Sequence, residues 1–114
     1  MRRIKSFIHA FNGLKVAFKE EPKFKIHVVA TIMVIAAGLY FQLSTTEWLA
    51  IVIVIGLVLL TELVNTAIEN IADFISPERH EKIKTIKDIA AAAVLISAIA
   101  ALVVGMLIFI PKIF

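Results

Sequence analysis

Residues 48–75 read WLAIVIVIGLVLLTELVNTAIENIADFI, and this stretch decides the fold. Its first part, Trp48 to Leu60, is entirely apolar but shorter than the roughly 20 residues that a helix needs to cross a bilayer. Its second part, Thr61 to Ile75, keeps apolar residues on one side while polar residues recur at helical spacing. Read as one helix, the stretch is long enough to span a membrane, so we predict a transmembrane helix over 48–75.

The composition of the whole chain indicates a membrane protein. Hydrophobic residues make up 61% of its 114 residues, whereas soluble proteins contain about 45–50% apolar residues. A chain of this length has too little interior to bury so much apolar surface, so lipid must cover the remainder. The sequence contains no cysteine, which excludes disulfides, cysteine-based zinc sites and thiol nucleophiles.

Two other apolar stretches have the length that crosses a hydrocarbon core of about 30 Å. They cover 26–43 and 89–110, and only a few polar side chains interrupt them. We therefore predict an all-α integral membrane fold and treat 1–114 as a single membrane domain. Its three transmembrane helices are expected at 26–43, 48–75 and 89–110.

Turn-forming residues separate the predicted helices. We expect a short outer turn at 44–46, which reads Ser-Thr-Thr. We expect a break at Ser76 and Pro77, because proline cannot continue a helix interior. For the same reason, the third transmembrane helix is expected to stop at Pro111.

Residues 1–20 carry a different pattern. Apolar side chains recur on one face of a helix, while basic side chains lie outside that stripe. The pattern is typical of an amphipathic helix that lies in the membrane surface. The apolar positions are Ile4, Phe7, Ile8, Phe11, Leu14 and Phe18.

The basic residues predict the orientation of the chain. Of the twelve Lys and Arg residues, all but Lys112 lie before the first span or between the second and third spans. Basic residues near the spans mark the cytoplasmic side. We therefore expect a cytoplasmic amino terminus and an external carboxyl terminus. The residues on the cytoplasmic side are Arg2, Arg3, Lys5, Lys15, Lys19, Lys23, Lys25, Arg79, Lys82, Lys84 and Lys87.

The polar residues of the middle helix fall on one face. At about 100° per residue, and with Glu62 at zero, they lie at about −60° for Asn65, −20° for Glu69, +20° for Asp73 and +40° for Thr66. Ionisable groups at membrane depth are costly and indicate function. The alternative is that Glu69, Asn70 and Asp73 simply emerge at the cytoplasmic interface.

Carboxylates on one stripe repel each other unless a metal ion, a lysine or a shared proton lies among them. Carboxylates with an asparagine are hard oxygen ligands, which suits magnesium that bridges substrate phosphates. Glu20 and Glu21 precede the first span, and Lys87 and Asp88 precede the third. We expect both pairs to converge with the polar stripe at the cytoplasmic interface, although solvated charges and a helix start would also explain them.

Familiar nucleotide-binding and hydrolase motifs are missing. The glycines are too far apart for a phosphate-binding loop, and no serine nucleophile motif occurs. We interpret His9, His27 and His80 as interfacial or structural, because they show no metal-ligand spacing. Small residues also recur at every fourth position of the last span, either by chance or to allow close helix approach. They are Ala93, Ser97, Ala101 and Gly105.

The run ELVNTAIENIAD at 62–73 is followed by SPERH at 76–80 and IKDIAA at 86–91. This combination resembles the signature of the small prokaryotic diacylglycerol kinase family, and the resemblance covers essentially the whole chain. It implies a homotrimeric, three-span enzyme of the bacterial inner membrane with an amphipathic surface helix. The implied reaction transfers the γ-phosphate of MgATP to a lipid alcohol.

The resemblance implies a role for each matching position. Glu62 resembles the family's catalytic base, and Glu69 with Glu21 resembles the pair that binds the metal ions on the nucleotide phosphates. Glu21 is preferred to Glu20 because of the residues that match around it. Nucleotide- and substrate-binding roles are implied for Asn65, Asp73, Lys87, Asp88, Lys5 and Arg2, with Lys87 on the phosphates.

Two lipids and one other class of protein remain open. The stretches FKIH at 24–27, LSTTEW at 43–48 and the exit at 105–111 resemble the undecaprenol kinase group of the family. We therefore expect undecaprenol as the substrate, with diacylglycerol as the alternative. The other class is a non-enzymatic oligomeric membrane protein whose polar stripe lines a lumen. The apolar run 48–60 argues against a lumen, because the stripe then forms a pocket open only to the cytoplasm.

Overall fold

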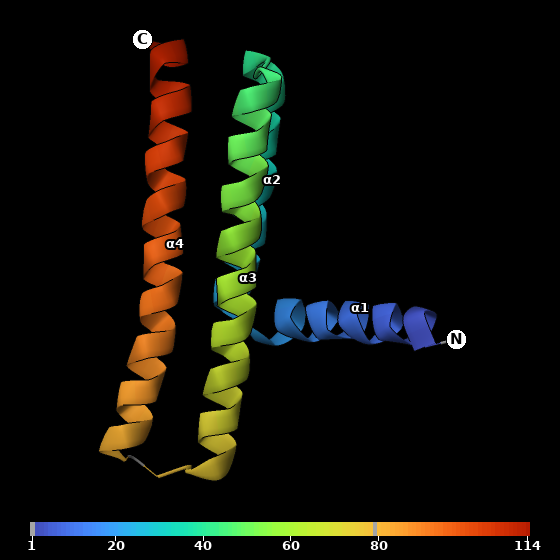
Figure 1. Ribbon diagram of the computed structural model, residues 1–114, viewed down its shortest axis with the longest axis vertical. Helices are drawn as coiled ribbons and strands as arrows, with labels where there is room; N and C mark the ends of the chain where they lie inside the picture. Colours follow the sequence, from blue (N-terminus) through green and yellow to red (C-terminus); the bar gives the residue numbers. More distant parts are fainter. Residues whose placement is uncertain (1, 79) are drawn as a thin grey trace.

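The computed structural model describes residues 2–78 and 80–114, so Arg79, one of the basic residues used to predict the orientation, lies outside the described residues. Three helices, of 20, 31 and 33 residues, are long and apolar enough to cross a membrane. The prediction of an all-helical fold with three spans and an amino-terminal helix is confirmed. The four helices (Figure 1) are α1 (Arg2–Glu20), α2 (Pro22–Phe41), α3 (Thr45–Ile75) and α4 (Glu81–Ile113).

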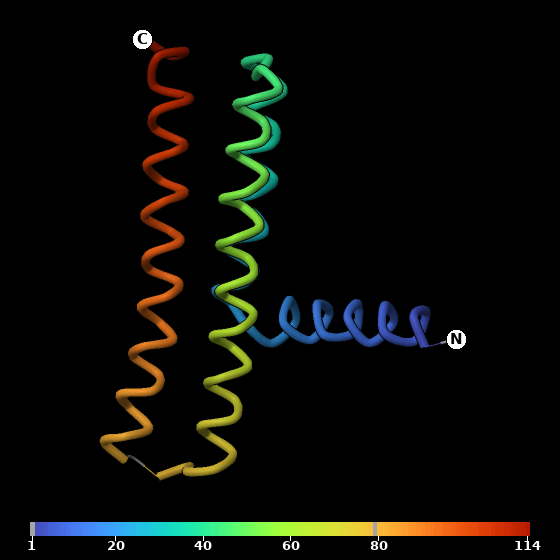
Figure 2. The backbone as a smooth tube through the Cα atoms, viewed as in Figure 1, coloured from blue at the N-terminus to red at the C-terminus, as the bar shows by residue number. Residues whose placement is uncertain are grey.

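The helices form an upright bundle with a side arm. The helices α2, α3 and α4 run along the long axis, while α1 leaves the bundle crosswise with the amino terminus at its far end (Figure 1). The chain trace in Figure 2 shows α3 and α4 running in opposite directions, and α2 lies against α3. A helix crosswise to three spans has the arrangement that a surface helix needs to lie flat on the bilayer.

The turn between α2 and α3 comes two residues earlier than predicted. Gln42 adopts a left-handed conformation with a φ of 53° and ends α2. The Ser44 hydroxyl accepts a hydrogen bond from the Glu47 N–H at 3.2 Å, and the Glu47 carboxylate accepts one from the Ser44 N–H at 2.9 Å. This capping box starts α3 immediately. Thr45 and Thr46, which we expected in the turn, are therefore helical.

The helix α4 extends beyond its apolar run at both ends. It begins at Glu81 instead of at 89, because the His80 imidazole caps its first turn. Asp88 therefore lies inside the helix and does not start it. The helix also continues through Pro111, so the predicted stop there is wrong. Near an open helix end, the missing N–H of a proline removes only one backbone hydrogen bond.

The core of the chain lies on α3, whose buried residues mostly recur three or four positions apart. On the α4 side, the hydroxyls of Thr61 and Ser97 lie 2.8 Å apart and join the two helices. The predicted small-residue ridge is only partly formed: Ser97 is buried, but Ala93 is exposed and a Cβ on Gly105 would meet no described atom within 4 Å. The buried residues of α3 are Ile51, Val54, Val58, Glu62, Asn65, Thr66 and Ala72.

The different lengths of α2 and α3 position the site. Both helices meet at the turn before Thr45, and α2 has 20 residues whereas α3 has 31. At about 1.5 Å of rise per residue, α3 is about 16 Å longer. The corner between α1 and α2 is therefore level with the first polar residues of α3. The rest of α3 and the first turns of α4 project past α1 (Figure 1).

We predict that Gly38→Ala destabilises the fold. A Cβ on Gly38 would lie 2.6 Å from Cη2 of Trp48 and 3.0 Å from Cδ1 of Leu43. Overpacking of this kind costs about 1–3 kcal/mol, so the Tm in detergent should fall. The matched control is Gly56→Ala, because a Cβ there would meet no described atom within 4 Å. An equal Tm for the two variants would contradict the close approach of Trp48.

Candidate active site

Glu62 is the most deeply buried residue of the polar stripe, with 1% of its surface exposed. Its Oε2 lies 3.5 Å from Nε2 of His27 on α2. Its other oxygen, Oε1, is buried and has no hydrogen-bond partner among the described residues. Burial of an unpartnered carboxylate oxygen is unfavourable, so Oε1 is an atom that a bound ligand would satisfy.

Asn65 and Glu69 form a second polar pair further along α3. The Nδ2 of Asn65 donates to Oε1 of Glu69 at 2.9 Å, which fixes the orientation of the amide. The Oδ1 of Asn65 is buried and lacks a partner in the described part of the chain. The stripe thus holds two unpartnered acceptors, on Glu62 and Asn65, about one helical turn apart.

The projecting ends of α3 and α4 carry a charged cluster. Lys87 pairs with Asp73 across the two helices. Asp88 does not pair with the neighbouring Lys87 but with Lys84, one turn earlier on α4, at 2.8 Å. The charged side chains that line a cavity of about 310 Å³ are these two lysines and the carboxylates of Asp73 and Glu78. Two lysines on the wall of one small cavity suit an anion such as phosphate.

Glu21 lies at the corner between α1 and α2, directly before the first residue of α2. Glu20 and Glu21 line a cavity of about 620 Å³ together with Thr66 and Asn70 of α3. Glu21 is half-buried whereas Glu20 is exposed. Within residues 2–78 and 80–114, no group of three His, Asp or Glu side chains is placed to hold a metal ion. A shared metal on Glu21 and Glu69 therefore stays a prediction.

Arg2 and Lys5 lie apart from the other predicted site residues. Both are exposed near the free end of α1, which points away from the bundle (Figures 1 and 2). The structure does not bring them to Glu62 of the same chain. Their predicted contact with a nucleotide stays a prediction.

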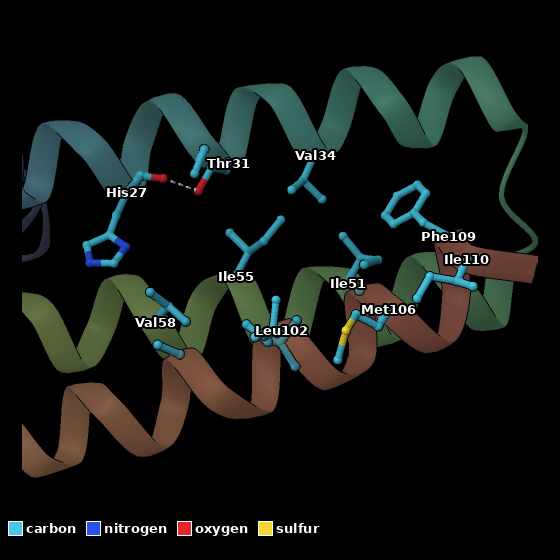
Figure 3. Close-up of a pocket in the computed structure, with 15 residues that line it drawn as sticks. His27, Thr31, Val34, Ile51, Ile55, Val58, Leu102, Met106, Phe109 and Ile110 are labelled. Atoms are coloured by element: carbon cyan, nitrogen blue, oxygen red, sulfur yellow. Dashed lines mark hydrogen bonds between the residues drawn. The ribbon is translucent and has the colours of Figure 1, made fainter. Parts of the chain in front are cut away.

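An apolar cavity of about 440 Å³ lies between α2, α3 and α4. Figure 3 shows His27 at one end of it, Phe109 and Ile110 at the other, and aliphatic side chains between them. Among the described lining residues, His27 and Thr31 carry the polar side chains. The Thr31 hydroxyl is already used, because it donates to the carbonyl of His27 at 2.7 Å. The cavity offers an alkyl chain a slot that ends next to the partner of Glu62.

Sequence reasoning missed two residues of this region. We interpreted His27 as interfacial or structural, whereas its imidazole faces Glu62. The available signal was that His27 is the one histidine or charged residue in the apolar stretch 26–43. Lys84 was counted only as a basic residue near the membrane, although its spacing of four from Asp88 predicts a helical ion pair.

Comparisons with known proteins match the chain to one family. The sequence pattern described as prokaryotic diacylglycerol kinase matches residues 8–109. The undecaprenol kinase of Bacillus subtilis (strain 168) is 40% identical over 111 residues, which cover 97% of this chain and 90% of that protein. The diacylglycerol kinase of Synechocystis sp. is 36% identical over 107 residues, covering 93% of this chain and 61% of that protein. The diacylglycerol kinase of Escherichia coli (strain K12) is 30% identical over 102 residues, which cover 90% of this chain and 84% of that protein.

Proposed function

The chain belongs to the prokaryotic diacylglycerol kinase family, and we propose that this membrane-bound lipid kinase phosphorylates undecaprenol. One observation carries the proposal: Glu62 contacts His27 through Oε2 where an apolar cavity ends, and its Oε1 is buried without a partner among the described residues. A polyprenol is a long apolar chain that ends in a single hydroxyl, which matches this combination. Membership of a kinase family also decides against the non-enzymatic membrane protein that the polar stripe alone left open.

The lining of the cavity supports a prenol over a diacylglycerol. A diacylglycerol carries two ester carbonyls near its hydroxyl, and buried carbonyls need hydrogen-bond donors. Of the described lining residues, His27 and Thr31 have polar side chains, and the Thr31 hydroxyl already donates to the backbone. Undecaprenol brings only its hydroxyl. The relation to the Bacillus subtilis undecaprenol kinase supports the same choice.

Glu62 is the general base in this proposal. Its carboxylate takes the proton of the lipid hydroxyl while the hydroxyl oxygen forms a bond to the γ-phosphorus of ATP. The bond from the γ-phosphorus to the bridging oxygen of the β-phosphate breaks, which leaves ADP and the lipid monophosphate. The proton stays on Glu62 until solvent removes it. Because Glu62 is level with the corner of α1, it meets a hydroxyl at the headgroup boundary where a surface helix lies.

The charged cluster at the ends of α3 and α4 binds the phosphates. Lys87 and Lys84 are the cations that line its cavity, and each is held by one carboxylate, Asp73 or Asp88. The role of both aspartates is to orient a lysine. Asn65, which lies between this cluster and Glu62 along α3, offers its unpartnered Oδ1 to the nucleotide or its hydrated ion.

The oxygen donors of the site suit Mg²⁺. In kinases this ion is bound by one or two carboxylates together with phosphates and water, so no complete protein cage is needed. Asn65 holds Oε1 of Glu69 and leaves its other carboxylate oxygen for an ion. Glu69 and Glu21 would hold the ion, which when bound neutralises charge on the transferring phosphate.

The assembly we propose is a homotrimer in the bacterial inner membrane, with the amino terminus and the sites on the cytoplasmic side. Large apolar side chains remain exposed on all three spans, so lipid or neighbouring subunits must cover them. Arg2 and Lys5 lie on the far end of α1, away from their own Glu62. In a trimer they reach a nucleotide bound at a neighbouring subunit.

The substrate is tested by phosphate transfer from labelled ATP in mixed micelles that contain either undecaprenol or diacylglycerol. We expect kcat/KM for undecaprenol to exceed that for diacylglycerol by about tenfold or more, since a buried carbonyl without a donor costs about 1–3 kcal/mol. Preference for diacylglycerol would overturn the choice of lipid and keep the kinase chemistry.

Glu62→Gln should lower kcat by about 100-fold or more, because the amide cannot accept the proton. MgATP binding should stay within about twofold, since Glu62 does not lie in the phosphate cluster. Glu47→Gln is the matched control, because Glu47 lies at the other end of α3. Turnover in Glu62→Gln equal to that of the control would refute the role of Glu62 as base.

Glu69→Gln should raise the Mg²⁺ concentration needed for half-maximal activity by about tenfold, because a carboxylate ligand is lost. The hydrogen bond from Asn65 can be kept, since glutamine retains one side-chain carbonyl oxygen. Titration of activity with MgCl₂ at fixed ATP measures the effect. An unchanged Mg²⁺ dependence would show that Glu69 is not a ligand.

A further inference from the structure

The imidazole of His27 places a nitrogen next to the carboxylate of Glu62. Its Nε2 lies 3.5 Å from Oε2, and the two side chains are 26% and 2% exposed. The two residues come from different helices, α2 and α3, so the contact is not a consequence of spacing along one helix. A polar pair at this depth is costly unless both members serve a purpose.

The two oxygens of Glu62 have different surroundings. Oε2 faces the imidazole, whereas Oε1 is buried without a partner in the described residues. The last torsion of a glutamate side chain is broad, so a free carboxylate samples many orientations. A base, however, must direct one oxygen at the hydroxyl of its substrate. A contact that holds one oxygen therefore aims the other.

We infer that His27 is a positioning residue, whose Nε2–H donates to Oε2 of Glu62 and thereby directs Oε1 toward the lipid hydroxyl. This inference rests on the proposed role of Glu62 as general base. His27 itself exchanges no proton with the substrate in this scheme. The geometry requires a proton on Nε2 of the imidazole.

The position of His27 explains how the contact responds to the substrate. A separation of 3.5 Å is long for a hydrogen bond, and catalytic hydrogen bonds are often long before substrate binds and shorten in the complex. His27 also lines the end of the apolar cavity. A lipid chain in that cavity excludes water from the pair, and the lower local dielectric strengthens the hydrogen bond.

The backbone of His27 is also held in place. The Thr31 hydroxyl donates to its carbonyl at 2.7 Å, within the same helix. On the other side of the pair, Glu62 is carried by the buried face of α3. Both members therefore have fixed backbones, and the remaining freedom lies in the side chains that the contact restrains.

The test compares His27→Gln with His27→Asn in the purified kinase, with MgATP and the lipid that it prefers. The glutamine amide nitrogen reaches approximately the position of Nε2, whereas asparagine is one methylene shorter and stops near Nδ1. We expect His27→Gln to keep kcat within about threefold of the unaltered enzyme. His27→Asn should lower kcat by about tenfold or more, with the KM for MgATP changed by less than about twofold in both variants.

The controls separate positioning from a merely structural role. His9→Gln and His9→Asn make the same replacements at an exposed position of α1 and should leave kcat unchanged. If His27→Asn does not fold, His27→Met takes its place, because its unbranched side chain fills similar space without a donor. A higher kcat for His27→Gln than for His27→Asn or His27→Met supports the inference. If His27 served only in packing, an amide nitrogen near the position of Nε2 would not restore kcat.

Equal kcat values for His27→Gln and the non-reaching variant, whether high or low, would overturn the inference. A change confined to the KM for MgATP would also overturn it. The Glu62→Gln variant reports on the proposed function separately. If Glu62→Gln is inactive but the His27 variants have equal kcat values, only the positioning role is refuted. If Glu62→Gln is active, the role of Glu62 as general base, on which the inference rests, is refuted.

Discussion

A carboxylate at membrane depth cannot face lipid, and the arrangement of the helices depends on this constraint. Glu62 is shielded because it lies on the buried face of α3 and contacts α2 through His27. On the α4 side, the hydroxyls of Thr61 and Ser97 are joined by a single hydrogen bond instead of facing hydrocarbon. The bundle thus surrounds one side of α3 with neighbours and leaves the apolar surface of every span to the membrane or to other subunits.

A second consequence comes from helix length. The bilayer core sets the length of a span at about 20 residues, and α2 has that length, whereas α3 has 31 residues and α4 has 33. The excess of both helices projects on the same side of α1 (Figure 1). Charged residues are unfavourable in lipid but not on this projection, so Asp73 and Lys87 can form an exposed pair. Our alternative reading of Asp73 as a residue at the interface agrees with its exposed side chain.

The sequence predicts those features of the fold that show as a repeating pattern or as the length of an apolar stretch. It indicates the three spans, the crosswise surface helix and the single polar face of 62–73, because each repeats over several turns. It does not predict contacts between helices. Periodicity shows which residues share a face of α3, but the partner of Glu62 depends on the register of α2 against α3, which periodicity does not determine. The predicted helix ends are wrong for local reasons, since the capping box at Ser44 and the cap at His80 depend on individual side chains.

The placement of the polar stripe also limits where phosphoryl transfer can occur. Side-chain exposure rises from 2% at Glu62 to 61% at Asp73, over a rise of about 16 Å along one rigid helix. In the reaction that we propose, the lipid hydroxyl comes from the buried end and a polyanionic nucleotide binds at the exposed end near the lysines. The two reactants would then meet between these limits. Asn65 and Glu69 occupy that interval and are joined by a hydrogen bond, so the proposal puts the γ-phosphate beside them when it is transferred.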